Sequence, residues 1–160
     1  MRRRGQIIEI ALVIIVAFIF ILANVIAGHI GLQIKDNLNN SNILTNESKE
    51  MLNSGVNNEI NTMDNLTLFI IGVIIVGIGV FSYLLPIHPA FVIIVIILSP
   101  FIVWLSGVVS NVYSDISTQT ILNTTAIYFT NGNMVMAYLP FFTMAAIVSF
   151  VAGMFMKVVR

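Results

Sequence analysis

The side chains that could carry out chemistry are few, and they lie far apart along the chain. There are two histidines, His29 and His88, and no cysteine. The histidines belong to different segments and no H-x-x-x-H or H-E-x-x-H spacing occurs, so we expect no zinc or di-iron site. Without cysteine there can be no disulfide, iron–sulfur cluster or thiol nucleophile.

The carboxylates do not form a pair suited to acid–base catalysis. Asp115 is the only formal charge between Asp64 and Lys157. Glu9 follows the basic start of the chain, where we expect a solvated interfacial carboxylate; the alternative is a contact with the N-terminus of another chain. Ionisable groups at mid-membrane usually mark ion paths, and the sequence places none there. We therefore expect no catalytic residue, no cofactor and no metal ion.

Three polar side chains are candidate ligands. His29 and His88 are expected at the membrane interface and in a turn, respectively, rather than on a metal. Asn24 is the most deeply placed polar residue of the first apolar segment. We expect it to hydrogen-bond to another helix, which is worth ~0.6–2 kcal/mol; a ligand site is the alternative.

The composition indicates a membrane protein. The chain has 160 residues, 58% of them hydrophobic and 9% charged, with a mean hydropathy of +1.00, whereas soluble domains carry roughly 25% charged residues. A helix of ~20 apolar residues spans the ~30 Å hydrocarbon core. Four segments have that character: 7–32, 66–85, 90–109 and 134–156. The sequence thus predicts an all-α integral membrane protein with four transmembrane helices in one transmembrane domain, residues 1–160.

Proline organises the middle of the chain. Pro86-Ile87-His88-Pro89 separates the second and third apolar segments, which predicts a helical hairpin with a four-residue turn. Pro100 lies inside the third segment and frees the carbonyl of Ile96. We expect a kink there, with the Ser99 hydroxyl or a neighbouring hydroxyl as partner for that carbonyl.

Small residues recur at helical spacing in three of the apolar segments. Such stripes let helix backbones approach closely, and Gly72 and Gly79 are expected to share one stripe. The last segment is expected to associate with a second copy or a partner. The predicted packing residues are Ala23, Asn24, Ala27, Gly28, Gly31, Gly72, Gly79, Ala145, Ser149 and Gly153.

Two polar segments remain, 35–64 and 110–133. The first is rich in Asn, which favours turns over helix interiors, so we expect a loop over 37–45. An amphipathic helix over 46–63 should follow, with disorder as the alternative. In the second, β-branched residues over 118–130 make a short strand or hairpin possible. Asn131-Gly132 favours a tight turn there.

Both ends of the chain are basic, which by the positive-inside rule places both termini on the cytoplasmic side. The two polar segments would then face the opposite side. The residues expected at the membrane surface are Arg2, Arg3, Arg4, Lys157 and Arg160.

The start of the chain resembles an archaeal prepilin leader. The resemblance rests on Arg4-Gly5-Gln6 before an apolar run with Glu9 close behind, and it implies a cut after the glycine. Here the glutamate is fourth rather than fifth after that cut, and pilins carry one such helix rather than four. The first segment is also too long for a secretory h-region.

A second resemblance begins at the hairpin turn. The runs 86–91 (PIHPAF), 110–113 (SNVY) and 139–141 (LPF) resemble small polytopic membrane proteins of tailless viruses with a membrane under or within the capsid. The resemblance implies a structural component of the virion membrane.

We therefore expect a non-catalytic structural protein, a membrane building block of a virion if this resemblance holds. The alternatives are a non-catalytic subunit of a larger membrane complex and a small channel or transporter. The expected partners are the lipid bilayer and other membrane or capsid proteins. An oligomer is expected and nucleic acid is not.

Overall fold

The computed structural model describes residues 5–41, 43–84 and 90–158. These residues form helices and no strands, and four of the helices are long and apolar enough to cross a membrane. The fold class expected from the sequence is thus confirmed. The helices are α1 (Gly5–Asn40), α2 (Asn46–Leu84), α3 (Ala90–Ser117), α4 (Thr120–Ala126), α5 (Thr130–Ala137) and α6 (Leu139–Val158).

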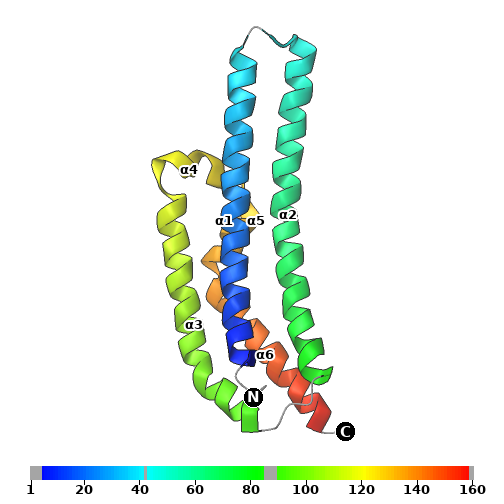
Figure 1. Ribbon diagram of the computed structural model, residues 1–160, viewed down its shortest axis with the longest axis vertical. Helices are drawn as coiled ribbons and strands as arrows, with labels where there is room; N and C mark the ends of the chain where they lie inside the picture. Colours follow the sequence, from blue (N-terminus) through cyan, green and yellow to red (C-terminus); the bar gives the residue numbers. More distant parts are fainter. Residues whose placement is uncertain (1–4, 42, 85–89, 159–160) are drawn as a thin grey trace.

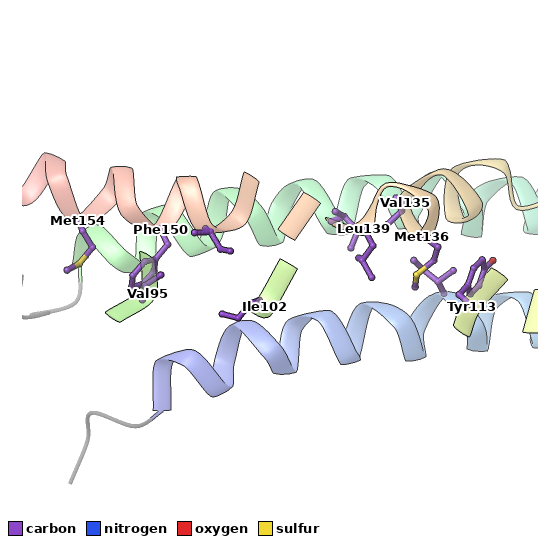
Figure 2. Close-up of a cluster of buried hydrophobic side chains, with 11 residues drawn as sticks. Val95, Ile102, Tyr113, Val135, Met136, Leu139, Phe150 and Met154 are labelled. Carbon is purple, nitrogen blue, oxygen red and sulfur yellow. The ribbon is translucent and has the colours of Figure 1, made fainter. Parts of the chain in front are cut away.

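The long helices form a bundle (Figure 1). The starts of α1 and α3 and the ends of α2 and α6 lie at the same end of this bundle, where both termini also lie. Helices α1 and α2 run antiparallel and reach well past α4, forming a projecting arm. Helix α6 packs mainly on α2 and α3. Figure 2 shows the apolar core: Val95, Phe150 and Met154 lie together, while Tyr113 and Met136 lie at the other end of the cluster.

The loop expected over 37–45 is shorter than predicted, because α1 continues to Asn40 and α2 begins at Asn46. The two helices contact one another there: Asn39 Nδ2 donates to Asn53 Oδ1 at 2.7 Å, and Lys49 Nζ donates to the Asn39 carbonyl at 2.5 Å. Packing between helices outweighs the low helix propensity of asparagine. The helix expected over 46–63 is present, as the first half of α2.

Further along, α4 occupies most of the range in which a strand was possible, so that expectation was wrong. Asn131 and Gly132 lie in the first turn of α5 rather than in a tight turn. The helix expected over 134–156 is divided, because α5 ends at Ala137 and α6 begins at Leu139. Pro140 follows at the second position of α6, where its missing N–H costs no helical hydrogen bond.

Helix α3 is continuous through Pro100. The Ser99 hydroxyl donates to the Ile96 carbonyl at 2.8 Å, which confirms the expected partner for that carbonyl. The kink stays a prediction, and the turn Pro86-Ile87-His88-Pro89 lies outside the described residues.

Candidate functional site

The end of the bundle away from the termini, called here the distal end, is closed by α4 and α5. We call residues 120–137 the α4–α5 cap. Most of the polar contacts between distant segments of the chain lie at this cap, and they are the candidate functional site.

Asp64 on α2 is a charged residue that is buried, with 5% of its surface exposed. Its Oδ2 accepts the N–H of Asn131 at 2.9 Å, and its Oδ1 accepts the N–H of Gly132 at 2.8 Å. The first N–H groups of a helix have no partner within the helix, and the residue before α5, Phe129, has no side-chain cap. Asp64 therefore caps α5 from another helix, where its charge also suits the positive helix end.

Gly132 makes this approach possible. A Cβ at this position would lie 3.3 Å from Ile21 Cγ2 and 3.6 Å from Asp64 Oδ1. The start of α5 therefore fits closely between α1 and α2. Next to it, Asn131 Nδ2 donates to Asn65 Oδ1 at 3.0 Å, which is a third hydrogen bond between the cap and α2.

Tyr113 joins the cap to α3. Its hydroxyl donates to Asn133 Oδ1 at 2.7 Å, and Asn133 Nδ2 donates to the Ala126 carbonyl at 2.7 Å. One turn earlier on α3, the Ser110 hydroxyl donates to the Met136 carbonyl at 2.7 Å. These bonds fix α5 against both α3 and the end of α4.

His29 joins the cap to α1. Its Nδ1 lies 2.9 Å from Thr125 Oγ1, and its Nε2 lies 3.0 Å from Gln33 Nε2. An amide nitrogen can only donate, so Nε2 accepts and Nδ1–H donates to the threonine. Both ring nitrogens of His29 thus have a hydrogen-bond partner within the chain.

Phe129 fills the space between the cap and α1. Its side chain is 1% exposed, and its ring lies so close to Gly28 that a Cβ there would be 2.7 Å from it. Val25, Ile60 and Ala126 complete this small apolar cluster. Gly28 therefore contacts the cap rather than another long helix.

A second close contact joins α2 to α6. Ser149 Oγ donates to the Ile75 carbonyl at 3.0 Å, and Ser82 Oγ donates to the Gly79 carbonyl at 2.8 Å. A Cβ on Gly153 would collide with Ser82 Oγ and the Gly79 carbonyl oxygen, and a Cβ on Gly79 would collide with Ser149 Oγ. We call these residues, Gly79, Ser82, Ser149 and Gly153, the α2–α6 seam.

Other predicted packing residues lie elsewhere. Ala23, Ala27 and Ala145 are exposed. Gly72 has open space beside it, so it does not share the contact that Gly79 makes with α6. Small residues on one face of a helix contact a second helix only over the turns where the two helices are close. Among the described residues, Gly72 therefore has no close neighbour from another helix, and the three alanines face outward.

Gly31 and Asn24 are intermediate cases. A Cβ on Gly31 would be in ordinary contact with Val56, at 3.9 Å. Asn24 Nδ2 is buried without a hydrogen-bond partner in the described part of the chain, so its hydrogen bond to another helix stays a prediction. Arg2, Arg3, Arg4, His88 and Arg160 lie outside the described residues, and Lys157 lies in the last turn of α6.

Asp64, Tyr113 and Phe129 were not predicted from the sequence to form one site. One signal was available, since Asp64 is the last charged residue before the fifty uncharged residues 65–114. A carboxylate at the edge of an apolar helix needs a partner if it is buried. Its partner could not be deduced, because the two backbone donors lie 67 and 68 residues further along the chain.

The arrangement suits hydrogen bonding between helices rather than bond making. In the described segments, no group of three or more His, Asp or Glu side chains comes together as a metal site would require. Comparisons with protein-family models, curated proteins and solved structures found no match.

Proposed function

We propose that this chain is a non-catalytic structural building block of a membrane. The observation that carries the proposal is that the buried carboxylate of Asp64 binds the backbone of α5. A buried carboxylate is often a functional group, yet here both oxygens hold the backbone of α5 in place. The charged side chain at the distal end thereby holds the α4–α5 cap on the bundle.

The other polar groups near the cap support the same proposal. His29, Tyr113 and Asn133 each bond to a neighbouring helix, and Ser149 of the α2–α6 seam bonds to a main-chain carbonyl. These groups stabilise the bundle through their hydrogen bonds and are therefore not available to bind a substrate. A protein whose task is to occupy and shape a bilayer needs this kind of interior.

The outer surface suits lipid or other membrane proteins as partners. Large apolar side chains face outward along the spanning helices, among them Phe69, Ile97, Trp104 and Val148. A virion membrane, with capsid proteins as further partners, is the setting that the viral resemblance favours. The proposed orientation puts both termini on the cytoplasmic side and the cap on the other.

A second candidate is a non-catalytic subunit of a larger membrane complex. It is favoured by the projecting arm (Figure 1), whose end carries Ile43 with 83% and Met51 with 72% of the side chain exposed. Exposed apolar side chains on a projecting element suit contact with another protein.

Copy number distinguishes the two candidates. The native membrane would be solubilised in mild detergent and the mass and composition of the released particles measured. A building block gives a large and regular multiple of this chain, whereas a subunit gives a fixed low stoichiometry beside other proteins.

Vesicles reconstituted with the purified protein would test the absence of transport. Proton and ion flux should match that of protein-free vesicles, both for the wild type and for His88→Ala. A robust flux through wild-type vesicles would overturn the structural proposal in favour of a channel or transporter.

A further inference from the structure

The α4–α5 cap depends on a charge in a way that the rest of the bundle does not. Its polar attachments to α1 and α3 are hydrogen bonds that involve no carboxylate, and Phe129 and Ala126 pack against apolar side chains of α1 and α2. Its polar attachment to α2 is made chiefly by the carboxylate of Asp64. We propose that Asp64 is an acid-sensitive latch, which holds the cap against the bundle when ionised and releases it when protonated.

The chemistry of the carboxyl group gives the mechanism. An ionised carboxylate offers two accepting oxygens, and here each one accepts a separate N–H. A protonated carboxyl has a hydroxyl in place of one oxygen, so a donor would face the N–H of Asn131 or Gly132. Protonation also removes the negative charge from the positive end of α5. Both losses weaken the same attachment.

The surroundings of Asp64 do not compensate for the loss. Helix α5 contains no titratable side chain, and α2 places the neutral Asn65 next in sequence. From α3 the titratable group that interacts with Asp64 is Tyr113. From α1 the side chain near this site is the apolar Ile21, which lies against Gly132. In the described part of the chain, Asp64 therefore relies on two backbone donors rather than on a cation.

His29 is the other titratable group that contacts the cap, through Thr125 of α4. It lies about two helical turns beyond Ile21 along α1. Its bond to Gln33 survives protonation if the amide turns its oxygen toward the ring. The two groups can therefore be separated by experiment, since only Asp64 contacts α5.

Release of the cap would uncover apolar surface. Phe129, Val135 and Met136 are 1%, 0% and 0% exposed when the cap is closed. They lie at the distal end, beyond which only the arm extends. Acid would thus make this buried apolar surface available to a bilayer or to another protein.

The test uses the absence of cysteine from the chain. Single cysteines replacing Ile127 in the cap and Ile43 in the arm would carry nitroxide labels, both positions being well exposed. Label mobility would be recorded in the full-length protein in detergent from about pH 7 to about pH 2.5, a range that covers the protonation of aspartate carboxylates in proteins. The label at Ile127 should gain a mobile component on acidification, and the label at Ile43 should not.

Two variants assign the response. Asp64→Asn should show the mobile component at about pH 7, with a population raised about five- to thirty-fold, as the loss of a capping interaction implies. It should lose the further response to acid. His29→Gln should keep that response, because its latch is intact.

The latch is overturned if the wild-type label at Ile127 does not respond to acid, or if Asp64→Asn behaves as the wild type at about pH 7. It is also overturned if His29→Gln abolishes the response. Should Asp64→Asn fail to fold, the wild type and His29→Gln still decide the question. None of these outcomes bears on the proposed structural function.

Discussion

Substitution of Gly153 by alanine should weaken the attachment of α6 to α2, and Gly72→Ala provides the matched control. The two glycines lie in long spanning helices, but only Gly153 lies in the seam. A Cβ there would collide with Ser82 Oγ and the Gly79 carbonyl oxygen and would lie 3.3 Å from the Gly79 carbonyl carbon, whereas Gly72 has open space.

The magnitude follows from three terms. Overpacking against backbone typically costs about 1–3 kcal/mol. Separating the helices also strains the Ser149–Ile75 hydrogen bond, which in membranes is worth roughly 0.6 kcal/mol. Alanine gains up to about 1 kcal/mol over glycine in a helix. Gly153→Ala should therefore lower the free energy of unfolding by about 1–3 kcal/mol, while Gly72→Ala leaves it unchanged or raises it by up to ~1 kcal/mol.

Reversible unfolding in mixed micelles, with increasing denaturing detergent and helicity followed by circular dichroism, would measure both variants. The difference between them matters more than either value, because detergent effects common to both cancel. If Gly153→Ala proves as stable as Gly72→Ala, the two backbones are not in close contact at Gly153, and the account of the seam is wrong.

Two further predictions concern the distal end. Cysteines placed at Asn40 and Thr124 should react with a membrane-impermeant reagent from the same face, and a cysteine at Gly5 only from the other; labelling of the first two from opposite faces would contradict the four-span topology. Gly28→Leu should cost about 1–3 kcal/mol of stability, because the new side chain must displace the Phe129 ring. That cost, measured by the same unfolding assay, should shrink in a Phe129→Ala background, and equal costs in both backgrounds would show that the ring is not the obstacle.

The spanning helices were predictable because their signal is local. Each consists of consecutive apolar residues, and the bilayer demands that a helix satisfy its own backbone. The same reasoning found Ser99 as the partner of the Ile96 carbonyl, since the two residues are three apart in one helix. Features that depend on residues close together in the sequence could therefore be predicted.

Features set by distant residues could not be predicted. Asparagine has a low helix propensity, so 37–45 was expected to be a loop. What extends the helices is packing of α1 on α2, including Asn39 on Asn53. The first turn of α5 likewise contains Asn-Gly, a local turn signal, and is helical because Asp64 supplies its cap. In both places long-range contacts outweighed local preference.

The unbroken course of α2 has a mechanical consequence. Its 39 residues make a rod of about 58 Å, roughly twice the thickness of the hydrocarbon core. No proline interrupts it between Asn46 and Leu84, so the usual cause of a sharp bend is absent. Helix α2 can therefore act as a lever. The part from the cap toward Asn46 belongs to the projecting arm, and the part on the other side of the cap contains Gly79. A force applied near Met51 would tilt the whole helix and so act on the α2–α6 seam near its other end.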